Sequence, residues 1–207
     1  MMEKMLIDVS HHNGVIDWAK VKASGIDGAI IRAGYGKVLS QKDKCFDANI
    51  KGCEAVGMPY GIYWYSYAKT PADARKEAAV CLKIIKNCKP LYPIYFDIED
   101  GCQIPLTKEL CTEITKAFCG CIEAAGYFAG VYSFDSFFAT NLEKTIPETY
   151  SAWVARVGGQ KPAHCKNYAV HQYSWEEKVP GITGDVDMNF CYKDFPGVIR
   201  KAHLNGY

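Results

Sequence analysis

Residues 91–100, with the sequence Leu-Tyr-Pro-Ile-Tyr-Phe-Asp-Ile-Glu-Asp, form an apolar segment that ends in acidic side chains. Aromatic and β-branched residues follow Pro93, and Gly101 ends the run, a pattern typical of a buried strand. Because successive strand side chains point to opposite faces, we expect Asp97 and Glu99 to share one face, about 7 Å apart along the chain. Crowded, partly desolvated carboxyl groups have separated pKa values, so a neutral acid stands beside an anion. Such a pair suits the cleavage of a glycosidic bond; the alternative is two solvated carboxylates where a strand meets a loop.

Segments with strand character alternate with helical segments along the chain. The expected strands are Met5–Val9, Gly28–Ala33, Pro59–Tyr67, Leu91–Asp100, Tyr127–Ser133, Tyr150–Val157, Tyr168–Tyr173 and Asp185–Phe190. The expected helices are Asp17–Ala23, Asp43–Val56, Thr70–Lys86, Thr107–Ala125, a short one within Ser133–Leu142, and Phe195–His203. The alternation predicts an α/β fold with a parallel sheet, and eight strands favour a closed (β/α)8 TIM-like barrel over an open sheet. The 207 residues are fewer than the about 250 of such barrels because helices are missing in the last third. We expect one domain, residues 1–207.

Four acidic residues that are far apart in the sequence fall at predicted strand ends. They are Asp8, Asp97, Glu99 and Asp187. In (β/α)8 barrels the active-site residues collect at the carboxyl ends of the strands. The sequence therefore predicts that these four carboxyl groups meet at one mouth of the barrel.

The composition gives no support for several classes of partner. With 24 Lys and Arg against 23 Asp and Glu, the formal net charge is +1, so nothing indicates binding to nucleic acid or to an acidic membrane surface. No apolar run approaches the about 20 residues of a membrane span. The segment Met1–Met5 leads into the first strand without the apolar core of a signal peptide.

The ten cysteines and five histidines lack the spacing of a zinc site. Several cysteines fall within helical patterns, and we expect mostly free, buried thiols, as in a reducing cytoplasm; a few disulfides formed after export are the alternative. The adjacent His11 and His12 cannot readily share one metal on a regular strand, and we interpret them as loop residues. We expect no metal and no cofactor.

Short motifs in a fixed order extend over essentially the whole chain. They are Asp8-Val9-Ser10 with Asn13-Gly14, Ile16-Asp17-Trp18, Ile31-Arg32-Ala33-Gly34-Tyr35-Gly36, Gly61-Ile62-Tyr63-Trp64-Tyr65, Asp97-Ile98-Glu99, Gly130-Val131-Tyr132, Trp153-Val154-Ala155, His171-Gln172-Tyr173 and Asp187-Met188-Asn189. In these motifs the chain resembles the glycoside hydrolase family 25 lysozymes, the Chalaropsis-type N-acetylmuramidases of bacteria, fungi and phages. One departure is Trp64, where the family more often has His.

The resemblance implies an irregular, flattened barrel that hydrolyses the β-1,4 bond between N-acetylmuramic acid and N-acetylglucosamine in peptidoglycan, with retention. Glu99 is then the general acid. Asp97 either attacks C1 directly or orients and stabilises the substrate's own 2-acetamido group as it attacks; the placement of Asp97 and Glu99 on one strand favours the second route. The resemblance also implies that Asp8 and Asp187 surround the sugar at the cleavage point, with Asp185 a weaker candidate.

Five further residues are candidates for binding the sugar, and each has a structural alternative. Tyr65, Tyr132 and Trp153 lie near strand ends, where they either stack on sugar faces or pack in the core. Arg32 pairs with a cleft carboxylate or forms a structural ion pair. Gln172 is a candidate hydrogen-bond partner for an acetamido group.

The expected partner is the glycan strand of peptidoglycan. We expect no binding to nucleic acid or to a membrane, and we expect the chain to be a monomer. We expect action on the cell wall, outside the cell or after release at host lysis, and the missing signal peptide favours a phage endolysin or a trimmed domain. Two other classes of function compete. A metal-dependent hydrolase or deacetylase would need several convergent histidines. A non-catalytic cell-wall sugar-binding module could use the same barrel, although the intact Asp97 and Glu99 argue against it.

Overall fold

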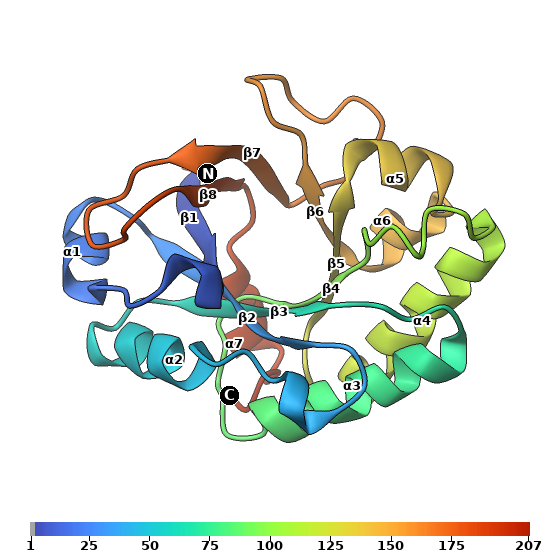
Figure 1. Cartoon of the computed structure of the whole chain (residues 1–207), viewed down its shortest axis with the longest axis horizontal. Helices are drawn as coiled ribbons and strands as arrows, with labels where there is room; N and C mark the ends of the chain where they lie inside the picture. The colour runs from blue at the N-terminus through green and yellow to red at the C-terminus, as the bar shows by residue number, and fades with distance from the viewer. Residues whose placement is uncertain (1–2) are drawn as a thin grey trace.

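The computed structural model describes residues 3–207, and its eight strands close into a barrel in sequence order (Figure 1). Met1 and Met2, part of the segment in which the sequence analysis expected no signal peptide, lie outside the described residues. The strands are β1 Lys4–Val9, β2 Gly28–Tyr35, β3 Tyr60–Tyr65, β4 Ile94–Asp97, β5 Ala129–Phe134, β6 Ser151–Ala155, β7 Val170–Glu177 and β8 Val186–Cys191. The predicted α/β barrel is confirmed.

The helices cover the barrel unevenly. They are α1 Trp18–Ala23, α2 Phe46–Ala55, α3 Pro71–Ile85, α4 Lys108–Ala124, α5 Asp135–Thr140, α6 Thr145–Thr149 and α7 Phe195–Lys201, with 3-10 turns at His11–Asn13 and Leu39–Gln41. Within residues 3–207 no helix connects β6 to β7 or β7 to β8, and in Figure 1 the loop between β6 and β7 runs along the top of the molecule. The prediction that helices are missing in the last third is confirmed. None of the helices in the described part of the chain is long and apolar enough to cross a membrane.

The direction of β8 corrects the sequence analysis. The first seven strands run parallel, but β8 is antiparallel to both β7 and β1. Residues 178–185 between β7 and β8 are too few for a parallel crossover, which needs a dozen residues or more, so they form a hairpin. Asp187 therefore lies at the start of β8 and not at its carboxyl end. Because β8 is reversed, its start nevertheless reaches the same mouth.

The strand that carries the acidic pair is shorter than predicted, since β4 ends at Asp97. The extended backbone nevertheless continues beyond it. Ser66 donates its N–H to the carbonyl of Asp97 at 3.0 Å, and Ile98 donates to the carbonyl of Tyr132 at 3.1 Å. Side chains keep alternating through this stretch, so Asp97 and Glu99 both face the barrel mouth while Ile98 packs outside.

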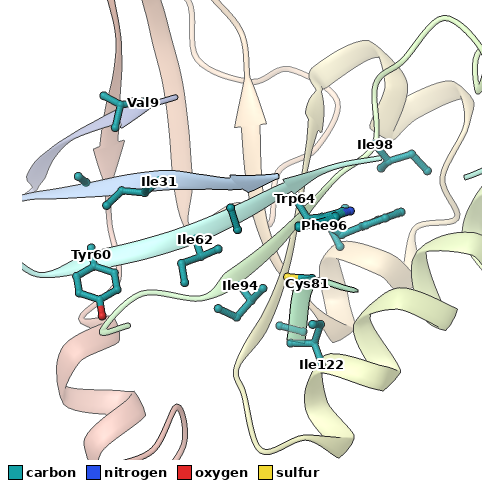
Figure 2. Packing of buried hydrophobic residues seen from close by; sticks show 14 of the residues in the cluster. Val9, Ile31, Tyr60, Ile62, Trp64, Cys81, Ile94, Phe96, Ile98 and Ile122 are labelled. Carbon is teal, nitrogen blue, oxygen red and sulfur yellow. The ribbon is translucent and has the colours of Figure 1, made fainter. Parts of the chain in front are cut away.

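Two layers of apolar side chains hold the barrel. The outer layer lies between the sheet and the helices, where Trp64, Phe96 and Ile122 pack together (Figure 2). The inner layer fills the barrel from Tyr95 up to Trp153, and α7 closes its base with Phe195. A Cβ at Gly130 would lie 2.5 Å from the Tyr95 ring, so glycine at this position makes room for a large ring inside the barrel.

The ten cysteines are all unpaired in the structure. Six of them are buried, namely Cys53, Cys81, Cys111, Cys119, Cys165 and Cys191. Cys81, for example, packs in the outer layer between α3 and the sheet (Figure 2). These thiols act as small apolar side chains.

Candidate active site

A cavity of about 320 Å³ opens at the barrel mouth, and all nine candidate site residues line it. They are Asp8, Arg32, Tyr65, Asp97, Glu99, Tyr132, Trp153, Gln172 and Asp187, and Asp185 joins them. The cavity wall also contains Tyr63, Ser10, His12 and Asn13, which the sequence analysis did not select as site residues. Strand alternation could have identified Tyr63, which is two residues before Tyr65 and shares its face. His12 and Asn13 belong to a 3-10 turn after β1, for which the sequence had suggested only a loop.

Asp8 and Asp187 form one carboxyl pair of the cavity. They are register partners across the antiparallel β1 and β8, which brings such side chains to about 5 Å from each other. The amide nitrogen of Gln172 donates to an oxygen of Asp8 at 2.9 Å and to one of Asp187 at 3.4 Å. Asn189 donates to the same Asp8 oxygen at 2.8 Å. Both amides favour an anion on Asp8.

The pKa values of this pair follow from that geometry. Burial raises the pKa of Asp8 to about 6, against the lowering effect of its hydrogen bonds from Asn189 and Gln172. Burial, followed by the neighbouring charge of Asp8, raises the pKa of Asp187 to about 8. At neutral pH the pair therefore holds one proton. The negative charge lies on Asp8, because Asp8 accepts hydrogen bonds from two side-chain amides.

Asp97 and Glu99 form the second pair. The Asp97 side chain is almost fully enclosed, and Glu99 is half-buried with more access to the cavity. Burial raises the pKa of Asp97 well above its usual range, and the charge of Glu99 raises it further. Burial, and then the charge of Asp8, raises the pKa of Glu99 to about 7. One buried oxygen of each carboxyl group has no hydrogen-bond partner among the described residues.

Arg32 does not pair with a carboxylate of the cavity. Its guanidinium contacts Asp43 at 2.9 Å through Nε and 2.8 Å through Nη2. Asp43 is buried outside the cavity lining and also accepts the backbone N–H of His11 at 3.1 Å. The structural ion pair, one of the two alternatives for Arg32, is thus the one observed. The helix α2 starts at Phe46 and not at Asp43 as expected, and Asp43 lies before it, accepting the backbone N–H of Cys45 at 2.9 Å.

The three aromatic candidates differ in how deeply their side chains are buried. Trp153 is 1% exposed, and its indole N–H donates to Asn189 at 2.7 Å. Its ring lies 4.3 Å from that of Tyr132, which is also buried. These two rings are core residues that present an edge to the cavity. Tyr65 is half-buried, and its hydroxyl donates to Asp100 at 3.1 Å, so part of this ring faces solvent at the mouth.

Gln172 connects the two halves of the site. Its carbonyl oxygen accepts the hydroxyl of Tyr132 at 2.7 Å and the indole N–H of Trp175 at 3.0 Å, while its nitrogen donates to Asp8. The amide is therefore engaged with protein groups at both ends, and it orients Asp8. Trp175 is a neighbour of the site that the sequence analysis did not single out.

The arrangement suits proton transfer more than metal binding. Among residues 3–207, no group of three or more His, Cys, Asp or Glu side chains is arranged to hold a metal ion. Four carboxyl groups with raised pKa values instead surround one cavity, so that neutral acids and anions coexist near pH 7.

Comparison with known proteins found a matching family and a curated relative. Residues 7–182 match the model of the family described as Glycosyl hydrolases family 25. An autolytic lysozyme from Clostridium acetobutylicum is 26% identical over 184 residues, which are 88% of this chain and 54% of that protein.

Two solved structures support the fold. The modular autolysin LytC from Streptococcus pneumoniae superposes with a TM-score of 0.83 at 33% identity, over 92% of this chain and 47% of LytC. A lysozyme from Streptomyces coelicolor superposes with a TM-score of 0.80 at 24% identity, over 92% of both chains. This chain thus spans about half the length of the autolytic lysozyme and of LytC. The match to the family model over most of its length shows that the chain belongs to glycosyl hydrolases family 25.

Proposed function

We propose that residues 1–207 form one catalytic domain that acts as a lysozyme on bacterial peptidoglycan. The bond cleaved is the β-1,4 bond between N-acetylmuramic acid and N-acetylglucosamine. The observation that carries the proposal is the convergence of Asp8, Asp97, Glu99 and Asp187 in one cavity of a family 25 chain. Two relatives agree in kind: one is named an autolytic lysozyme, and LytC has been solved in complex with a synthetic peptidoglycan ligand.

Glu99 is the general acid of this proposal. It has the more accessible carboxyl group of its pair, and its pKa near 7 keeps a proton available at neutral pH. It donates that proton to the glycosidic oxygen as the bond from C1 to this oxygen breaks. The leaving sugar departs with a new hydroxyl group, and Glu99 becomes the base for the second step.

Asp97 acts on the C1 side of the reaction. Either its carboxylate attacks C1, or it holds the N–H of the 2-acetamido group while the acetamido oxygen attacks C1. The positive charge that develops on the sugar favours the ionised form of Asp97 during the reaction, although burial favours the neutral form in the empty cavity. Water, deprotonated by Glu99, then attacks C1 and restores the original configuration. Asp8 and Asp187 stabilise the developing charge from the opposite wall.

The alternative function is a non-catalytic module that binds cell-wall sugars on the same barrel. Unpartnered, buried carboxyl oxygens on Asp97 and Glu99 favour catalysis over binding, because holding a sugar alone needs no such costly groups. The action would take place on the cell wall with a monomeric chain.

Mass spectrometry of fragments released from purified peptidoglycan tests the proposal, with borohydride reduction to mark new reducing ends. Muramitol ends are the expected result. Glucosaminitol ends would keep a glycosidase but contradict the assigned bond. Binding to several wall types without release of fragments would favour the binding module.

A further inference from the structure

A second hollow of about 270 Å³ continues the cavity along β5, β6 and β7. Each of these strands contributes one residue to the cavity and a later one to the hollow: Tyr132 and then Phe134, Trp153 and then Ala155, Gln172 and then Trp175. Since residues two apart on a strand share a face, the hollow is the outward extension of the cavity wall. The hollow therefore lies next to the cavity, and the hydrogen bond between Trp175 and Gln172 joins their walls.

Trp175 forms the open side of this hollow. It is 43% exposed, whereas Trp18, Trp64 and Trp153 are each at most 5% exposed. A large indole on the surface beside a cleft is unusual, because such a ring is normally buried. Its ring lies 6.3 Å from that of Phe134 at an interplanar angle of 74°, an edge-to-face arrangement, and the exposed fraction of Trp175 leaves part of the indole open to a ligand.

An irregularity in β7 aims this ring at the cleft. Residues three apart on a regular strand point to opposite faces, yet the Trp175 indole N–H donates to the Gln172 carbonyl at 3.0 Å. The register between β7 and β8 shifts between Gln172 and Ser174, which indicates a bulge at this point. Bulges of this kind redirect side chains, often next to active sites. The bulge and the hydrogen bond hold the indole in one orientation.

The rest of the hollow offers apolar surface and little free charge. Ala155 and Val157 supply apolar surface. The one strong cation there, Arg156, is engaged at 2.8 Å with Asp135 and at 2.8 Å with Gln160. An acidic peptide would find no free counter-charge on Arg156, whereas the flat apolar face of a sugar ring fits an indole.

We propose that Trp175 and this hollow form a further sugar subsite, which binds one N-acetylated sugar of the same glycan strand beyond the cleavage point. This inference rests on the proposed function, since it takes the ligand of the cavity to be a glycan. Trp175 is then a specificity-determining residue that makes the protein prefer longer strands.

The test is binding to the Glu99→Gln protein, which is not expected to consume its ligand. The probes are peptide-free GlcNAc–MurNAc oligosaccharides of two and of six sugars, and a peptide-bearing six-sugar fragment. Calorimetry measures affinity, and acrylamide quenching of tryptophan fluorescence reports on Trp175, because the other three indoles are buried. We expect the six-sugar ligand without peptide to protect the indole from acrylamide and to bind more tightly than the two-sugar ligand.

Three variants separate the effect of the Trp175 ring as a contact surface for the sugar from the effect of its hydrogen bond to Gln172. Trp175→Ala is expected to weaken six-sugar binding about two- to tenfold, the effect of losing one aromatic contact, and to weaken two-sugar binding by less, because that ligand meets only the loss of the hydrogen bond to Gln172. Trp175→Phe keeps a ring and loses the bond to Gln172, so it should retain most of the affinity. Ser136→Leu places an apolar side chain in the hollow from the exposed first turn of α5, and it should weaken six-sugar binding without changing Trp175.

Each other outcome overturns the inference in a distinct way. Tight binding of the six-sugar ligand without protection of Trp175 would reject the subsite and keep the proposed function. Protection by the peptide-bearing fragment alone would assign the hollow to the peptide. Equal losses in Trp175→Phe and Trp175→Ala would mean that the indole only positions Gln172. No binding of any fragment would reject the inference together with the proposed function.

Discussion

Glu99 and Asp97 are two residues apart and face one cavity, yet their surroundings differ. Asp97 lies deep between the register neighbours Tyr65 and Tyr132, whereas Glu99 follows the strand end and reaches the open part of the cavity. A group that must deliver a proton to a bound glycan needs this access. The difference in depth supports the proposed acid role of Glu99 and the proposed role of Asp97 at C1.

We expect Glu99→Gln to lower kcat on purified peptidoglycan by about a thousandfold, because the amide keeps the size of the side chain but cannot donate the proton. Reducing ends released per minute give the rate. Glu113→Gln, the same change on the exposed face of α4, is the matched control and should behave as wild type. A Glu99→Gln protein with wild-type rates would reject the acid assignment.

The pH dependence of the rate follows from the same group. Burial raises the pKa of Glu99 to about 7, and only the protonated form can act as acid. The value of kcat/KM on a soluble glycan oligomer should therefore fall as the pH rises through about 7, by about tenfold for each further pH unit. Constant ionic strength is needed, since the cavity is charged. A flat profile from pH 6 to pH 9 would contradict this assignment.

The sequence predicted this site well where one strand determines it and poorly where two segments meet. Strand alternation placed Asp97 and Glu99 on one face without any tertiary information. The partner of Arg32 is Asp43, which comes from the loop before α2, and no local pattern encodes that pairing. The aim of Trp175 depends on a bulge, and a bulge is set by the pairing of β7 with β8.

The elements of the last third illustrate the same limit. The eight strands were predicted because their apolar runs and turn residues are local signals. The direction of β8 was predicted wrongly, since strand–helix alternation was extended to a connection, residues 178–185, too short for a crossover. The length of the connection 178–185 indicates the direction of β8, which the strand–helix alternation does not.

The loop between β6 and β7 replaces a helix, and one carboxylate from α5 holds it. Asp135 accepts the backbone N–H groups of Ala163, His164 and Cys165 at 2.8–3.0 Å and the side chain of Arg156 at 2.8 Å. Asp135→Ala would leave these donors without a partner and lower the free energy of unfolding by about 2–4 kcal/mol.

Urea denaturation measures this loss, and hydrogen exchange at residues 163–165 locates it. Asp73→Ala removes an exposed ion pair with Lys37 and, as the control, should cost under about 1 kcal/mol. Unchanged exchange at 163–165 in Asp135→Ala would show that the loop is held by other contacts.

At the scale of the whole molecule, the active site opposes the stability of the fold. The barrel core supplies two layers of buried apolar side chains, whereas the mouth encloses four carboxyl groups. Charged forms of enclosed carboxyl groups are disfavoured relative to water, so the folded state binds protons more tightly than the unfolded chain does. Stability should therefore depend on pH in a direction opposite to that of ordinary acid denaturation.

The pKa of Asp187 rises from 3.8 in the unfolded chain to about 8 in the folded state, and that of Asp8 to about 6. Between about pH 4 and pH 8 the native state thus holds more protons, and the free energy of unfolding falls as the pH rises. Glu77, a buried residue of α3 with a pKa of about 7, acts in the same direction, while the lowered pKa of His12 opposes it. A loss of about 2 kcal/mol would lower the thermal midpoint by roughly 4–8 °C.

The substitution Asp187→Asn isolates the contribution of the mouth, because asparagine resembles the protonated form of Asp187 at every pH. This variant should match wild type at about pH 4 and below, and it should melt progressively higher than wild type from there to pH 8.5, with a flatter slope between. Glu77→Gln measures the part that comes from α3, and Asp185→Asn, which removes an exposed pair with Lys178, should leave the slope unchanged. Scanning calorimetry at fixed ionic strength gives the midpoints. If Asp187→Asn kept the full wild-type slope while losing activity, the four carboxyl groups would matter for the reaction without weakening the fold, and the opposition between site and stability would be wrong.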